Sequence, residues 1–149
     1  MIATLLAVLG TLAGATVTGL LQHFNSSRAD RRQRESQRRA ALLEALVELQ
    51  GAIVGHREQQ YLKISDRRAG VPDTREAREA RYAARTRLTG ALDRLHLLTD
   101  DPELLAAAQE ARNAAVALGD APLSQTDQVG QRARETHTHL RQVAARRLA

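Results

Sequence analysis

The chain has 149 residues, a formal net charge of +5 and no cysteine, which excludes disulfides, thiolate metal sites and a lipidated cysteine. Aromatic residues make up 2% of the chain and alanine dominates its apolar residues, so we expect a core that buries little area per residue. The pattern of the sequence divides the chain into three parts, residues 1–24, 25–41 and 42–149.

The first stretch, residues 2–21, contains no charged, amide or aromatic side chain. A helix of this length covers roughly 30 Å, the thickness of the hydrocarbon core of a bilayer. We therefore predict a transmembrane helix within residues 1–24. A signal peptide and a buried core helix are the alternatives, but neither explains both the length of this stretch and the charges that follow it.

Small residues recur at every fourth position of the predicted span, at Gly10, Gly14 and Thr18. Residues four apart share one helical face, and membrane helices associate where small side chains let their backbones approach. The spacing resembles the glycophorin-type dimer face and predicts a homodimer or homo-oligomer. The alternative is chance, because small residues are frequent throughout this chain.

A basic segment follows the span, between residues 25 and 41. It contains two acidic residues and six arginines, namely Arg28, Arg31, Arg32, Arg34, Arg38 and Arg39. Because cationic residues stay on the cytoplasmic side of a membrane, we predict a single-pass protein of the cell membrane with its N-terminus outside and its C-terminal domain in the cytoplasm. The same arginines would contact anionic lipid headgroups.

Residues 42–149 are predicted to begin with the rest of a long helix that ends at Gly70 and Pro72. Its apolar positions follow heptad spacing along one seam, made of Leu42, Leu46, Leu49, Ile53, His56 and Gln60. A neighbouring row, Leu43, Val47 and Val54, is expected to widen this seam enough to contact more than one partner helix. We expect His56, on the seam, to be a partly buried and hydrogen-bonded ring.

Three more helices are predicted, each with a start or stop signal. The second helix should start with Asp73 as the capping acceptor and Glu76 three residues later, and the third with Asp101 and Pro102. Gly119 is the predicted C-cap of the third helix, and Ser124 or Thr126 the predicted cap of the fourth. No stretch alternates with the period of a strand. We therefore predict an all-α domain, an antiparallel helical bundle joined to a long basic helix.

The sequence offers no pattern typical of an enzyme or a metal protein. His137 and His139 are two residues apart, which places them on different faces of a helix, and no phosphate-binding loop or nucleophile elbow occurs. We therefore predict no catalytic residue, cofactor or metal. The basic residues of the fourth helix are interpreted as a solvated face, since no aromatic residues interleave them for stacking on bases.

Two strings, LAVLGTLAGATVTGLLQ in the span and LLTDDPEL at a helix junction, together with the arginine-rich helix, resemble a group of small actinobacterial membrane proteins. This group includes the Kil-type spread proteins of conjugative plasmids. The resemblance implies a role at the membrane in the spread of plasmids between mycelial compartments.

Two functional hypotheses remain open at this point. One is a membrane-anchored interaction scaffold that associates with itself and with other proteins. The other is a membrane-tethered nucleic-acid-binding protein that uses the arginine-rich helix. Salt dependence separates them, because DNA binding through several arginines weakens steeply as salt rises.

Overall fold

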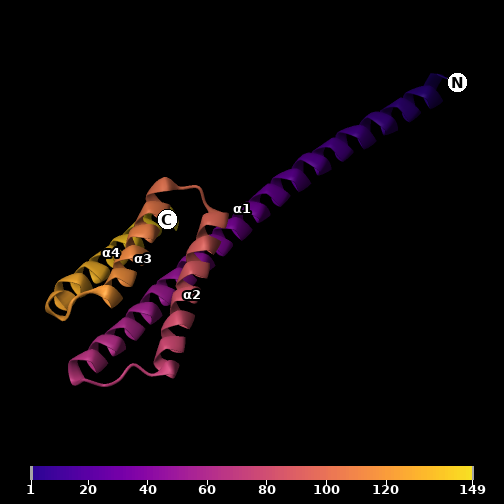
Figure 1. Cartoon of the computed structure of the whole chain (residues 1–149). Coiled ribbons are helices and arrows are strands. Elements are labelled where there is room, and N and C mark those ends of the chain that lie inside the picture. The colour runs from indigo at the N-terminus through magenta and orange to yellow at the C-terminus, as the bar shows by residue number, and fades with distance from the viewer. Residues whose placement is uncertain (1, 149) are drawn as a thin grey trace. The chain divides into compact units, whose positions relative to one another are not determined.

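Helices make up nearly all of the described chain. The computed structural model describes the backbone of residues 2–148 and the side chains of residues 30–148. Its elements are α1 (Ile2–Ala69), α2 (Arg75–Leu98), α3 (Pro102–Asp120), the 3-10 turn η1 (Leu123–Gln125) and α4 (Thr126–Leu148) (Figure 1). No strand occurs between residues 2 and 148, so the prediction of an all-α protein is confirmed.

The chain consists of two compact units, Met1–Arg39 and Ala40–Ala149. The predicted transmembrane segment, residues 1–24, lies outside the described side chains. Within the described part of the chain, no helix is both long enough and apolar enough to cross a membrane.

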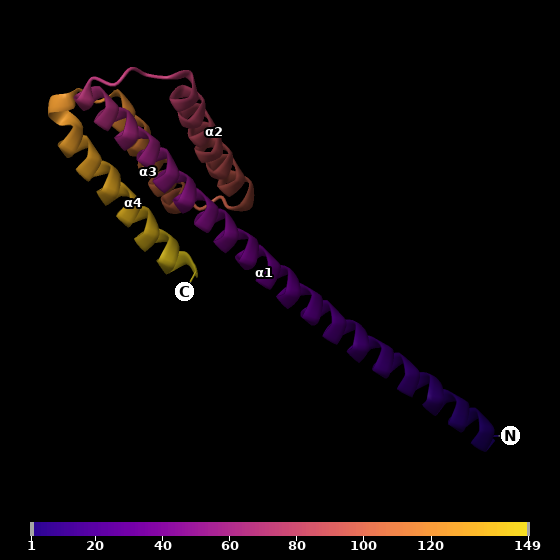
Figure 2. The same cartoon turned by 90° about the horizontal axis from the view of Figure 1, so that it is seen from below.

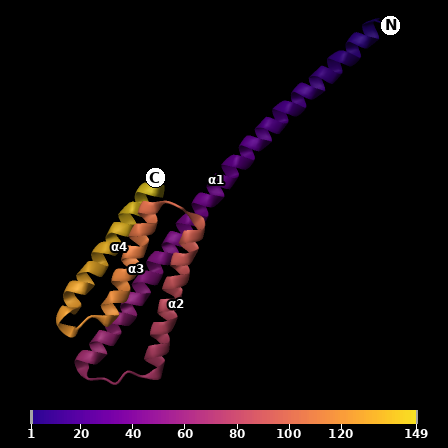
Figure 3. The same ribbon diagram turned by 45° about the horizontal axis from the view of Figure 1, so that its top comes forward.

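The second unit is a bundle of four helical segments, the part of α1 from Ala40 onward and the whole of α2, α3 and α4. Short connections reverse the chain between successive helices, so that neighbours run antiparallel, and α3 and α4 lie side by side (Figure 2, Figure 3). This arrangement confirms the predicted antiparallel bundle.

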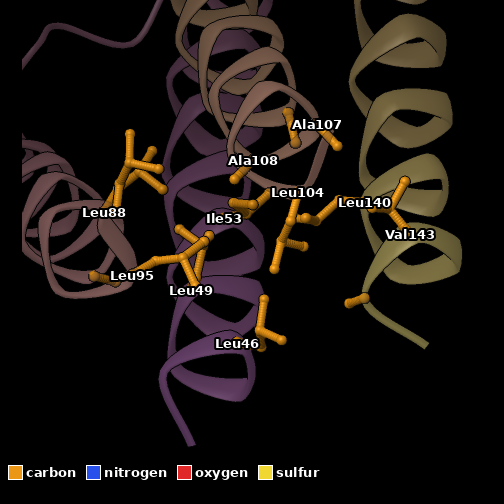
Figure 4. Close-up of a cluster of buried hydrophobic side chains, with 14 of the residues drawn as sticks. Leu46, Leu49, Ile53, Leu88, Leu95, Leu104, Ala107, Ala108, Leu140 and Val143 are labelled. Atoms are coloured by element: carbon orange, nitrogen blue, oxygen red, sulfur yellow. The ribbon is translucent and has the colours of Figure 1, made fainter. Parts of the chain in front are cut away.

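The predicted seams converge on one core in the second unit. Its largest fully buried side chains come from all four helices and are Leu46, Leu49, Ile53, Leu88, Leu95, Leu104, Leu118, Leu140 and Val143 (Figure 4 shows most of them). Alanines of α3, among them Ala108, Ala111 and Ala115, fill the spaces between them. Because alanine adds little width to a helix, α3 can lie close to α4.

One predicted row does not join this core. Leu43, Val47 and Val54 are 49%, 62% and 46% exposed, so a second partner helix does not cover this row, although Leu43 and Val47 line a hollow beside α4. The seam of α1 widens on its opposite flank instead, where Ala45 is fully buried and Ala52 is partly buried. Small residues on that flank, together with Gly90 and Ala91 of α2, line a hollow between the two helices.

The C-terminal end of α1 is formed by a local signal in the sequence. Gly70 has a φ of 68°, and the N–H groups of Gly70 and Val71 donate to the carbonyls of Arg67 and Asp66 at 3.4 and 2.9 Å. This is a Schellman C-cap, a left-handed turn that favours glycine. The predicted end of the helix is therefore confirmed.

The start of α2 lies where it was predicted, but a different side chain caps it. The Thr74 hydroxyl accepts the N–H of Ala77 at 3.2 Å, whereas the Asp73 carboxylate accepts from the Arg81 guanidinium at 2.6 and 2.7 Å. Asp73 is therefore held by an arginine two turns away instead of by the helix end.

The start of α3 follows the prediction, and the start of α4 does not. Asp101 accepts the N–H groups of Glu103 and Leu104 at 3.0 and 3.1 Å, with Pro102 at the first helical position. The Thr126 hydroxyl instead donates to backbone carbonyls of the preceding turn. The 3-10 turn leads directly into α4, so that neither Ser124 nor Thr126 caps it as predicted.

Candidate interaction surfaces

The predicted basic patch lies on α1, in the first unit. Five of its arginines have described side chains, and all five are exposed: Arg31, Arg32, Arg34, Arg38 and Arg39. At about 100° per residue they fall within an arc of roughly 160°, so they form one cationic face of the helix. The Arg28 side chain lies outside the described residues. Contact of this face with a lipid or a nucleic acid stays a prediction.

The predicted dimer face of the span, Gly10, Gly14 and Thr18, also lies outside the described side chains. Its role stays a prediction from the spacing of small residues.

A polar layer inside the bundle joins α1 to α3. Gln60 Nε2 donates to His56 Nε2 at 3.3 Å, and both residues are buried. The Gln60 carboxamide packs onto Gly119, where an added Cβ would lie 2.2 Å from the Gln60 Oε1. Lys63 Nζ then donates to the Gly119 carbonyl at 2.8 Å. The sequence hypothesis for His56 is confirmed, and the layer fixes how α1 and α3 align.

Gly119 therefore has a different role from the predicted one. The helix continues through it to Asp120, so Gly119 is not a C-cap. Its missing side chain makes room for Gln60. Sequence reasoning placed Gln60 on the seam, but no local signal linked it to a glycine 59 positions later in the chain.

Burial lowers the pKa of two histidines in the bundle. Burial, and then the charges of Arg85 and Arg112, lower the pKa of His56. Burial likewise lowers the pKa of His137, with smaller effects from Arg57 and Arg141. Among the side chains of residues 30–148, no three His, Asp or Glu residues are grouped closely enough to hold a metal ion.

Acidification should therefore destabilise the bundle. As pH falls below about 6.5, the ordinary pKa of histidine, the unfolded chain binds protons that the folded chain does not bind. The urea midpoint, followed by circular dichroism, should be lower at pH 5.5 than at pH 7.5, and this fall should shrink in a His56→Gln, His137→Gln double variant. Replacing the exposed His96 by Gln should leave the fall unchanged. If the double variant falls as far as the wild type, these two imidazoles do not control the response.

A second set of polar contacts links α1 to α4. Arg57 Nη1 donates to the Ala133 carbonyl at 3.2 Å, and Arg134 Nη1 donates to the Tyr61 hydroxyl at 3.0 Å. Burial lowers the pKa of the Arg57 guanidinium, and its Nε is buried without a hydrogen-bond acceptor. Arg57 is thus a partly desolvated cation at the edge of the bundle.

Three of the five arginines of α4 form ion pairs with acids of α3. Arg132 pairs with Glu110 at 2.8 Å, and both Arg146 and Arg147 pair with Glu103 at 2.7 Å. These pairs are partly exposed, and each contributes about 0–1 kcal/mol to stability. The sequence showed few acids close to these arginines along the chain, because the acids that pair with them lie one helix earlier.

Comparison with known proteins places the second unit in a family. The sequence model of the KilB plasmid transfer protein family matches residues 43–148. Protein KilB of Streptomyces lividans is 37% identical over 100 residues, which cover 66% of this chain and 65% of that relative's length. No solved structure matches the chain. The predicted resemblance to Kil-type spread proteins is confirmed, and the chain belongs to the KilB plasmid transfer protein family.

Proposed function

We propose that this protein is a membrane-anchored helical scaffold that assists the spread of a conjugative plasmid at the membrane. The observation that carries the proposal is the change in sequence between residues 2–21, which contain no charge, and residues 25–41, which contain six arginines. Such a change is typical of a single span followed by a cytoplasmic domain. Membership of the KilB family supports the role in plasmid spread.

In this proposal the anchor and the bundle have separate tasks. The span holds the chain in the membrane, with lipids as its first partners and with Gly10, Gly14 and Thr18 as a contact between copies. The basic segment contacts anionic headgroups on the cytoplasmic side. The bundle then presents helical surfaces to protein partners, and its role is one of binding and not of catalysis.

Membrane extraction of the full chain tests the anchor. The wild type should stay in the membrane pellet through both high salt and alkaline carbonate, because a spanning helix is not held by charge. Leu9→Arg with Ala13→Arg should move the chain to the soluble fraction, since each charge at the centre of a span costs about 2.5–3.5 kcal/mol.

The matched control adds two arginines at exposed positions of α2, as Ala83→Arg with Thr86→Arg, and should stay with the membrane. Release of the wild type by salt alone would contradict a span and would leave the basic segment as a peripheral membrane contact.

A nucleic-acid-binding protein is the second candidate, favoured by the cationic arc of Arg31, Arg32, Arg34, Arg38 and Arg39 on one side of α1. Binding through these side chains would give a DNA affinity that falls with a logarithmic salt slope of about −0.9 for each phosphate contacted. A scaffold should retain little DNA at physiological salt. Retention that Arg→Gln changes in this arc abolish would favour the second candidate.

A further inference from the structure

An exposed apolar stripe runs along α1 in the second unit, and we define it as Leu43, Val47, Val54 and Tyr61. Their exposed fractions range from 38% to 62%. The intervals of 4, 7 and 7 residues place all four within an arc of about 40°. Because these large apolar side chains lie along a single line of the helix, the stripe is typical of a contact surface and not of scattered exposure.

The two flanks of the stripe carry opposite charges. Arg57 lies on the flank nearer α4, where it contacts the Ala133 carbonyl and where Arg134 donates to Tyr61. Glu58 lies about 100° further round α1. On that other flank, Glu44 and Glu48 form ion pairs with Arg94 of α2. The stripe is therefore bordered by cations towards α4 and by acids towards α2.

Neither charge next to the stripe is neutralised within the second unit. Among the side chains that the structure describes, Arg57 and Glu58 take part in no ion pair. Both line a shallow hollow on α1 together with Val54 and Tyr61. A partner that fits this surface must supply an apolar row, an acid opposite Arg57 and a cation opposite Glu58.

We propose that a second copy of this chain covers the stripe, with the two α1 helices parallel and in register. In a parallel two-fold pair, opposite flanks of the two helices face each other, so that Arg57 meets the partner's Glu58 twice by symmetry. An antiparallel pair would bring like flanks together and would oppose cation to cation. The parallel pair also places each residue of the stripe against its own counterpart, and side chains of the partner enter the hollow as knobs enter holes.

This pairing goes beyond the proposed anchor, because it lies wholly in the second unit. It is also separate from any contact between spans. A chain whose span does not associate could still pair through the stripe, and the two contacts can be tested one at a time.

Cysteine crosslinking of the full chain in detergent tests the proposal, because the native sequence has no cysteine. The background carries Gly14→Ile, which removes the predicted contact between spans. On mild oxidation, Val54→Cys and Val47→Cys should each form a disulfide-linked dimer, since residues on a parallel axis meet their own counterparts. The matched control Ala83→Cys, exposed on α2, should stay monomeric.

Charge and orientation supply the second part of the test. Glu58→Arg should abolish the Val54→Cys dimer because Arg57 would then face a cation instead of the carboxylate of the partner's Glu58, whereas Thr86→Arg on α2 should not. A Val54→Cys dimer no more abundant than the Ala83→Cys dimer would overturn the proposal. So would a disulfide that forms only between Val47→Cys and Tyr61→Cys chains, because that result requires antiparallel helices. Circular dichroism of Glu58→Arg should match the wild type, since this exposed change breaks no contact of the bundle.

Discussion

Leu46→Ala and Leu95→Ala should each lower the free energy of unfolding by about 2–5 kcal/mol, because both changes leave a cavity in a close-packed core. The two side chains are 1% and 0% exposed, and they extend from α1 and α2 into the same cluster (Figure 4). A domain of this size is held by about 5–15 kcal/mol in total. A core rich in alanine has few other large side chains to compensate. Urea unfolding of the full chain, followed by circular dichroism, measures the effect.

Leu97→Ala provides the matched control for these variants. It makes the same chemical change on the same helix as Leu95→Ala, but Leu97 is 86% exposed. Its urea midpoint should stay close to that of the wild type. If Leu46→Ala and Leu95→Ala also unfold at the wild-type midpoint, α1 and α2 do not share a core and do not belong to one bundle.

Gly119→Ala and Gly90→Ala should change stability in opposite directions. Both glycines are helical, but a Cβ at Gly119 would lie 2.2 Å from the buried Gln60 side chain, and a Cβ at Gly90 would meet nothing within 4 Å. Gly90→Ala should stabilise the bundle by up to about 1 kcal/mol through helix propensity. Gly119→Ala should destabilise it by about 1–3 kcal/mol, since it displaces Gln60 from its hydrogen bond to His56.

A double variant identifies the cause of the Gly119 effect. Gln60→Ala removes the side chain that the new methyl group would strike, so adding Gly119→Ala to Gln60→Ala should cost less than adding it to the wild type. If Gly119→Ala raises the urea midpoint as much as Gly90→Ala does, the close packing of Gln60 on Gly119 does not exist in solution.

The predictions from sequence were accurate where the cause is local. Gly70 ends α1 because a left-handed turn favours glycine, and Asp101 with Pro102 starts α3 because the first turn of a helix needs acceptors for its N–H groups. Heptad spacing likewise identified the buried leucines of α1. Each of these features depends on residues within a few positions of one another.

The predictions failed where the cause lies in another helix. Asp73 leaves its expected capping role because Arg81 binds it, and Gly119 accommodates Gln60 of α1 instead of ending α3. Periodicity could not distinguish the row of Leu43 and Val47 from a row of core residues. Amphipathic spacing shows which residues share a face of a helix, but not how much of that face the neighbouring helices cover. For the candidate surfaces, sequence identified the exposed arginines of α1, whereas the partly desolvated Arg57 emerged only from its packing against α4.

The proposed anchor requires one orientation of the chain in the membrane, with residues 25–149 in the cytoplasm. The most direct measurement is a pair of reporters fused after Ala149, one active only in the cytoplasm and one active only after export. We expect activity from the cytoplasmic reporter alone, because arginines that follow a span favour the cytoplasmic side of the membrane. Replacing the six arginines by glutamine should give a mixture of orientations. Activity of the exported reporter on the unmodified chain would contradict a cytoplasmic C-terminal domain.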